Sequence, residues 1–522
     1  MLWDFLCTFV GVKENDNKLS DKNMWNKPWT MKEGFLIGGG LIIAGLLLQL
    51  SVGPVVWDAF AWNANGIVLS GFFVMLTAMV YLRNRVYAFK WMATNQAAIP
   101  AMVYAVVLTI IMGLTRQYER GTWFNNMLSF WPFVLTYVYL TVILGLTIHR
   151  RLRAIFRGQG SIKRDVPFML NHLGLFIALT TATLGSADIQ RVKMITAIGQ
   201  SEWRALEQNG AIKEMPIAIE LKKFIMETYD NGSPKRFASE IQILTKTGKN
   251  IETTVEVNKP YEVDGWKIYQ YGYDTQMGAQ SQVSILELVT DPWLPWVYAG
   301  FYMMLAGAAV MTVMVLWRRF KSASRKALGW YLFFAACAAM FAYFFFDSYN
   351  TKTLVPALQS PWFAPHVFVY IFAYTLLGIA VVIAWWKRVD DLVYVSFAFL
   401  TFGMLFGALW AKEAWGHYWS WDPKETWAAI TWIAYLVYIH YRRLPQQRNR
   451  LAFWMLVGSF VLLQMCWWGI NYLPSAQGAS VHTYSTSECY LHGRFIIILK
   501  FKHKITNYYS YFILNDYICN IF

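Results

Sequence analysis

Residues 365–386 read PHVFVYIFAYTLLGIAVVIAWW, a stretch that contains no Asp, Glu, Lys or Arg. A helix rises about 1.5 Å per residue, so about 20 apolar residues cross the roughly 30 Å hydrocarbon core of a bilayer. The stretch therefore predicts a transmembrane helix. Comparable runs begin near Phe35, Ala64, Ala97, Met127 and Val166, and occupy 293–316, 327–346, 392–411, 427–442 and 452–471. We expect an all-α polytopic membrane bundle with about 11 transmembrane helices.

The composition agrees with a membrane protein. Of the 522 residues, 57% are hydrophobic, 18% are aromatic and 26 are tryptophan, and the mean hydropathy is +0.33. Soluble domains are less apolar on average. Tryptophan also gathers at membrane interfaces, but so many rings indicate that some of them line a binding surface.

The formal net charge of +15 is explained by topology rather than by nucleic acid. Basic residues concentrate at 83–85, 149–157, 318–326, 386–388 and 441–450, which are alternate loops between the predicted spans. Cytoplasmic loops carry such an excess of Lys and Arg, so the N-terminus is expected inside. The five cysteines form no CxxC pair, which argues against a zinc site or a thiol redox site.

A long polar segment, residues 187–291, interrupts the apolar pattern. FASEIQILT and NIETTVEV alternate as strands do, with turn signals at 246–248 and 264–265. We expect one small, mainly β, extracytoplasmic domain. The remaining divisions are a five-helix membrane region (1–186), a linking helix and cytoplasmic loop (292–326), a second membrane domain (327–484) and an atypical tail (485–522). The tail is either a twelfth hydrophobic segment or a non-native end.

Two histidines and a tryptophan-rich loop are expected on the outer face. His366 opens the helix quoted above, and His482 follows the last clear span. Between them lies the outer loop 415–427, WGHYWSWDPKETW, with Trp415, Trp419, Trp421 and Trp427. Two imidazoles beside an aromatic platform suit a bis-histidine heme. The alternative is an interfacial aromatic belt.

Two further histidines are predicted at comparable depth near the inner surface. His172 lies near the start of the fifth span and His440 at the end of the tenth, so they form a second candidate heme site. His149, in an inner basic cluster, competes with His172 for this role. The alternative is that each is an interfacial histidine bonded to a headgroup or a carbonyl.

The tryptophan loop also carries a specific resemblance. WGHYWSWDPKETWAAITW resembles the WWD signature of heme-handling proteins of cytochrome c maturation, and residues 327–484 resemble the CcsA (ResC) branch in particular. From about residue 166, NHLGLFIALTTATLGS, VNKPYEVDGWKIYQYGYD and DPWLPWVYAGFYMMLAG are similar to the CcsB (ResB) partner. The whole chain resembles a fused CcsB/CcsA, the system II cytochrome c synthase. Its outer domain is shorter than that of many CcsB proteins, and its tail departs from the family.

The resemblance implies a function in cytochrome c biogenesis. Heme would cross the membrane to the external site and be attached to CxxCH motifs of apocytochrome c, the reaction of a holocytochrome c synthase of the heme lyase type. It implies heme b as substrate and bound ligand, thiol reductants as further partners, and no nucleophile from the enzyme itself. The implied location is the bacterial inner membrane, with the β domain and the WWD loop on the periplasmic side, and a thylakoid membrane is the alternative.

The same resemblance assigns the site residues. The implied iron ligands are His366, His482, His172 and His440, and the implied heme platform is Trp415, Trp419, Trp421, Asp422 and Trp427. Two other functions remain open. One is a heme exporter or chaperone that delivers heme to a separate ligase, and the other is a di-heme b-type electron carrier.

Overall fold

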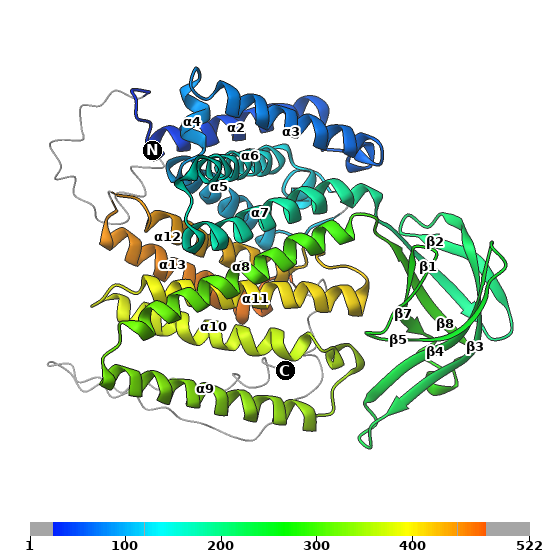
Figure 1. Cartoon of the computed structure of the whole chain (residues 1–522). Helices are drawn as coiled ribbons and strands as arrows, with labels where there is room; N and C mark the ends of the chain where they lie inside the picture. Colours follow the sequence, from blue (N-terminus) through cyan, green and yellow to red (C-terminus); the bar gives the residue numbers. More distant parts are fainter. Residues whose placement is uncertain (1–24, 119–120, 446, 477–522) are drawn as a thin grey trace.

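The computed structural model describes residues 25–118, 121–445 and 447–476. Those residues form a bundle of long helices with a β domain at one end (Figure 1). His482 and the tail therefore lie outside the described residues.

Long helices make up most of the described chain. Their bounds are α2 (Met31–Val52), α3 (Ala64–Leu82), the short α4 (Tyr87–Met92), α5 (Asn95–Leu114), α6 (Trp131–Ala154), α7 (Ile162–Gly185), α8 (Leu294–Lys321), α9 (Arg325–Thr351), α10 (Phe363–Ala384), α11 (Asp390–Trp415), α12 (Pro423–Tyr441) and α13 (Asn449–Trp467). A helix occupies each of the eleven predicted spans, and nine of the described helices are long and apolar enough to cross a membrane. The predicted polytopic bundle is confirmed.

Helices α7 and α8 pack closely because glycines face each other across their contact. A Cβ on Gly174 would lie 2.8 Å from the carbonyl oxygen of Gly300, and a Cβ on Gly300 would lie 2.7 Å from the backbone nitrogen of Ala178. Small residues of this kind let membrane helices approach closely. Helix α8 also packs against α11, so it bridges the first and second halves of the chain.

The β domain is a single eight-stranded antiparallel sheet with the order β5-β4-β3-β2-β1-β8-β7-β6. Its strands are β1 (Gln190–Ala197), β2 (Ser201–Glu207), β3 (Ile212–Thr228), β4 (Pro234–Thr245), β5 (Asn250–Glu256), β6 (Tyr261–Val263), β7 (Trp266–Tyr273) and β8 (Val283–Thr290). Alternate residues such as Ile217, Ile219 and Leu221 are buried in one hydrophobic cluster. The predicted turns join β4 to β5 and β6 to β7, and each contains a glycine with positive φ, Gly248 and Gly265.

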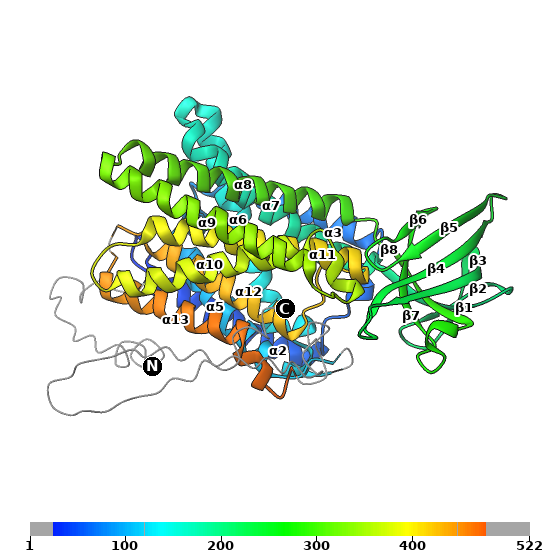
Figure 2. The same ribbon diagram turned by 90° about the horizontal axis from the view of Figure 1, so that it is seen from below.

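The sheet meets the bundle where α7 ends and α8 begins, and both views show it at this end (Figures 1 and 2). Arg318 and Arg319 end α8 at the opposite end of the bundle, where both contact Asp391 at the start of α11. Cations at a helix C-terminus and anions at an N-terminus are favourable. The basic clusters and the β domain therefore lie at opposite ends of the helices.

Candidate functional site

The tryptophan loop, residues 415–427, is fixed at both of its ends. Helix α11 ends at Trp415 and is capped by Gly416, whose φ of 73° is the left-handed conformation that glycine adopts without strain. At the other end Asp422 caps α12, since its Oδ1 accepts the Glu425 N–H at 2.8 Å. The Glu425 carboxylate in turn accepts the backbone N–H of Ser420 at 2.7 Å. Asp422 and Glu425 thus shape the loop by capping its backbone.

The four tryptophans of the loop lie in different surroundings. Trp419 and Trp421 form an edge-to-face pair with ring centroids 5.6 Å apart, and Trp421 has a positive φ of 58°. Trp415 packs on Trp410 of α11 at 4.9 Å. These three loop rings are half-buried, whereas Trp427 is only 3% exposed and packs against α5. Trp427 is therefore placed to anchor the loop to the first half of the chain.

His366 lies in the first turn of α10, and its ring packs against α11. Its Nδ1 is 2.7 Å from the carbonyl oxygen of Gly403, and its ring centroid is 5.8 Å from that of Trp410. A carbonyl partner at Nδ1 selects the tautomer in which Nε2 carries the lone pair, the form that binds a metal. Gly407 makes room for the ring, since a Cβ there would lie 2.7 Å from the His366 Cε1.

His172 and His440 face each other, although one comes from α7 and the other from α12. Their ring centroids are 6.4 Å apart at an interplanar angle of 66°. Each Nδ1 bonds the carbonyl oxygen of the residue four positions earlier, at 2.9 Å for His172 and 2.8 Å for His440. Both rings thus favour the tautomer with the lone pair on Nε2.

This separation fits two axial ligands of one iron. An imidazole nitrogen lies about 2 Å from its metal, and the ring centre lies about 1 Å further, so opposed ligands have centroids roughly 6 Å apart. His149, the other candidate from the sequence, lies close enough to Arg153 and Arg83 to feel the positive charge of both. The structure therefore pairs His440 with His172.

Aromatic and basic side chains surround the inner pair. Phe168 stacks on His172 with ring centroids 3.9 Å apart, and the guanidinium of Arg151 lies 5.7 Å from the Phe168 ring. Arg443 follows His440 by three residues, and its guanidinium lies 5.6 Å from the ring of Tyr394. Flat rings and cations are the groups that a porphyrin with two propionates would meet.

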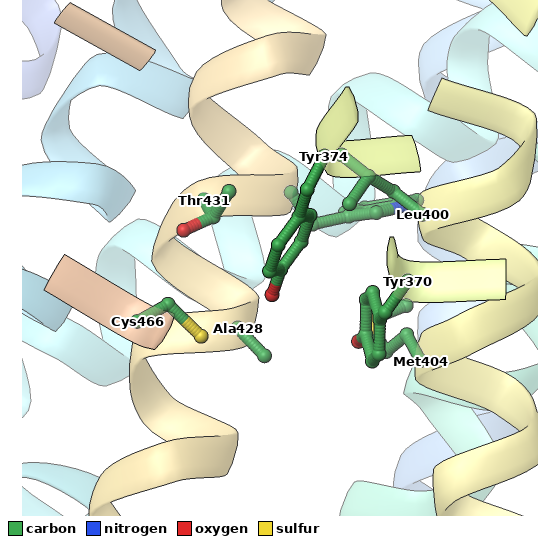
Figure 3. A pocket seen from close by; sticks show the side chains of 8 residues that line it. Tyr370, Tyr374, Leu400, Met404, Ala428, Thr431 and Cys466 are labelled. Atoms are coloured by element: carbon green, nitrogen blue, oxygen red, sulfur yellow. The ribbon is translucent and has the colours of Figure 1, made fainter. Parts of the chain in front are cut away.

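A narrow cavity lies in the core between the outer and inner histidines. Figure 3 shows Tyr374 between Tyr370 and Met404 on one side and Thr431 and Cys466 on the other. Its volume of about 10 Å³ holds roughly one water molecule. The helices are thus closed around this point, and the cavity is far too small for a porphyrin.

An open cleft of about 380 Å³ lies where the β domain meets the segment before His366. Its β-domain wall includes Arg236, whose guanidinium contacts the carboxylates of Glu227 and Glu256. This pairing lowers the pKa of Glu256. On the other wall Glu413 accepts the indole N–H of Trp362 at 2.8 Å. The cleft thus has charged walls, and its second wall leads directly into α10.

Some site residues could not be found from local sequence patterns. Gly403 and Gly407 are spaced four apart and so share the face of α11 that receives His366. Their spacing is a signal, but it does not name the partner helix. Lys412 and Asp291 form a buried ion pair beside the loop, and they are too far apart in sequence for any local pattern to connect them.

Fold and site together define a class. The protein is a multi-pass helical membrane protein with a separate antiparallel β domain, and it carries a tryptophan loop and an opposed histidine pair at different ends of its bundle. Comparison with protein families then adds two matches. Residues 296–476 match the cytochrome C assembly protein family, and residues 159–285 match the ResB-like family. One polypeptide thus contains a region similar to cytochrome C assembly proteins and a region similar to the ResB-like family.

Curated relatives match about a quarter of the chain. Cytochrome c biogenesis protein CcsA of Chlamydomonas reinhardtii is 36% identical over 158 residues, covering 26% of this chain and 44% of that protein. The CcsA proteins of Synechococcus sp. (strain RCC307) and Atropa belladonna are 33% and 32% identical, covering 26% and 27% of this chain and 58% and 60% of those proteins. The chain thus spans about half the length of the curated relatives it matches.

The two family matches divide the candidate site between them. His172 lies in the ResB-like region, whereas His366, the tryptophan loop and His440 lie in the cytochrome C assembly region. The inner histidine pair is therefore shared between the two regions.

Proposed function

We propose that the chain acts in cytochrome c biogenesis as a fused CcsB/CcsA synthase. It carries heme b across the membrane and attaches it to apocytochrome c. One observation carries this proposal: a ResB-like and a cytochrome C assembly region in one chain each contribute a histidine to a pair whose rings are 6.4 Å apart.

The inner pair is the proposed site of heme uptake. His172 and His440 bind the iron from opposite faces, and their Nδ1 bonds to backbone carbonyls hold each ring in the required tautomer. Arg443 supplies positive charge for the propionates, whereas the guanidinium of Arg151 is already paired with the carboxylate of Asp165. Because the cavity around Tyr374 is too small for heme, heme passes outward along another route or after the helices separate.

The outer site is the proposed place of attachment. His366 and His482 hold the iron, and Trp415, Trp419 and Trp421 give the flat rings that contact the porphyrin. Asp422 and Trp427 contribute by holding the loop in shape. This division of roles rests on the burial of Trp427 and on the capping bond of Asp422.

The chemistry requires positioning more than it requires a nucleophile. Each cysteine thiol of a CxxCH motif adds across a heme vinyl group: a carbon–sulfur bond forms, the vinyl π bond is lost and the proton goes to the other vinyl carbon. The thiolates come from the apocytochrome, kept reduced by thiol reductants of the pathway. The enzyme contributes orientation and a shielded site, as expected of a holocytochrome c synthase.

The proposed location is a bacterial inner membrane, with the β domain and the tryptophan loop in the periplasm. Both lie at one end of the bundle, opposite the basic clusters, and positive loops face the cytoplasm. The cleft along Arg236 and Glu413 opens beside the outer site, and we propose that the apocytochrome approaches there.

The test is covalent cytochrome c formation in a host without other maturation factors. The full chain is expressed with an apocytochrome, and covalent heme is detected by staining a denaturing gel. We expect product from wild type and none from His366→Ala. Heme binding without product would favour a heme exporter or chaperone instead, and heme that stays bound during turnover would favour a di-heme electron carrier.

A further inference from the structure

A buried ion pair joins the β domain to the end of α11, directly before the tryptophan loop. Lys412 lies in the last turn of α11, and its Nζ is 3.1 Å from Oδ2 of Asp291, the residue that follows β8. Each side chain is 4% exposed. Burying two charges is costly unless they are paired, so this contact favours one position of the α11 end relative to the sheet.

The loop itself also touches the sheet, directly after this pair. A Cβ on Gly416 would lie 3.0 Å from Cγ2 of Val289 in β8 and 3.2 Å from the ring of Tyr269 in β7. Both residues are 3% exposed. Gly416 is therefore held so closely against two strands that a Cβ there would require Val289 or Tyr269 to shift by a few tenths of an ångström.

The same turn of α11 carries the aromatic rings that reach the outer site. Trp410 contacts His366, with ring centroids 5.8 Å apart, and packs on Trp415 at 4.9 Å. Lys412 lies between these two tryptophans in sequence. Any displacement of this turn toward or away from the β domain therefore moves both rings relative to His366.

We propose that Lys412 is a positioning residue for the outer heme site. Its ion pair with Asp291 fixes the last turn of α11 on the β domain and thereby fixes Trp410 and Trp415 beside His366. The β domain, most of which lies in the ResB-like match, thus determines the geometry of a site built by the helices of the second region. The inference rests on the proposed function, since it takes His366 as a heme ligand.

The experiment measures heme affinity at each site separately in the purified full chain. Outer binding is measured in a His172→Ala background and inner binding in a His366→Ala background, by titration with heme and dithionite difference spectra. The variants are Lys412→Met, Asp291→Asn and the charge-conserving Lys412→Arg. Loss of a group bonded directly to a ligating histidine typically costs 10–100-fold in metal affinity. Lys412 acts on His366 only through Trp410, so we expect a loss of about 10-fold, the lower end of that range, at the outer site for the first two variants, with Arg restoring most of it.

An independent variant tests the same contact without changing charge. Gly416→Ala places a methyl group against Val289 and Tyr269, and we expect it to weaken outer heme binding and to shift the α-band of the reduced outer heme. Gly199→Ala is the matched control, because Gly199 has the same φ of 73° but nothing within 4 Å of its Cβ position. The control should leave both properties unchanged.

Three results would overturn the inference. Unchanged outer affinity and spectrum in folded Lys412→Met and Gly416→Ala would show that the contact does not position the site. An equal fall in inner affinity would show a general loss of structure instead. If the protein with Lys412 unchanged bound no heme at the outer site, the proposed function itself would be refuted. This outcome is distinguishable from the first two, because both of those require outer heme in the protein with Lys412 unchanged.

Discussion

Replacing Gly407 with alanine is expected to damage the outer heme site without weakening the helix that carries it. The added Cβ would lie 2.7 Å from Cε1 and 2.8 Å from Nδ1 of His366, whereas ordinary contact begins at 3.4 Å. The ring must therefore recede by about 0.7 Å. A shift of that size away from α11 would lengthen the 2.7 Å bond from Nδ1 to the Gly403 carbonyl beyond the usual range of about 2.7–3.2 Å.

The magnitude follows from the loss of that orienting bond. Second-shell partners of a ligating histidine are typically worth 10–100-fold in metal affinity, or about 1.4–2.8 kcal/mol. Alanine favours a helix over glycine by about 1 kcal/mol, so the bundle itself should not lose stability. We therefore expect weaker heme binding by His366 in a protein that folds as well as wild type.

Heme titration of purified Gly407→Ala, in a His172→Ala background that removes the inner site, measures this loss. Gly458→Ala in α13 is the matched control, because nothing lies within 4 Å of the position its Cβ would take. If Gly407→Ala bound heme with the affinity of the control, His366 would not be held by α11 in the way described.

Three further outcomes follow from other contacts. His440→Ala should abolish the inner heme and leave the outer one, as a pyridine hemochrome assay of heme content would reveal; loss of both would contradict separate sites. Glu256 has a pKa lowered from 4.5 by Arg236, so its contribution to stability is present above that pH and lost as the pH falls through its folded value. Thermal unfolding of Glu256→Gln should lose this part of the acid sensitivity, and an unaltered pH profile would count against it. Asp390→Asn removes the charged partner of the Arg442 guanidinium, which is 5% exposed and keeps its bond to Asn449. Because Asp390 itself is 28% exposed, we expect a cost of about 1.5–3 kcal/mol in unfolding experiments, and an unchanged stability would contradict that burial.

The helices and hairpins were predictable because their signals are local. Apolar runs of membrane-spanning length mark the helices, and a glycine with positive φ closes each predicted hairpin, as at Gly248. The comparable depth of His172 and His440 was predictable for the same reason. Which inner histidine meets His440 was not, because the side on which a helix presents a residue depends on packing with neighbouring helices.

The outer site was less predictable because its residues act through partners distant in sequence. Trp427 belongs to the tryptophan-rich pattern, yet Gly113 of α5 leaves room for its ring and the ring is buried there. Asp422 is part of the same motif, and its carboxylate caps α12. The pairing of Lys412 with Asp291 depends on the β domain folding back onto the bundle, which no local pattern specifies.

The shared histidine pair has a consequence for assembly. His172 and His440 come from regions that match two different protein families, so neither region alone can supply both imidazoles. If the two regions were separate proteins, formation of the pair would depend on their association and therefore on their concentrations in the membrane. A covalent connection makes the meeting intramolecular, so it does not depend on the concentration of a separate partner. One gene product thus guarantees equal numbers of both ligands, and the pair does not depend on how sparsely the protein is distributed in the membrane.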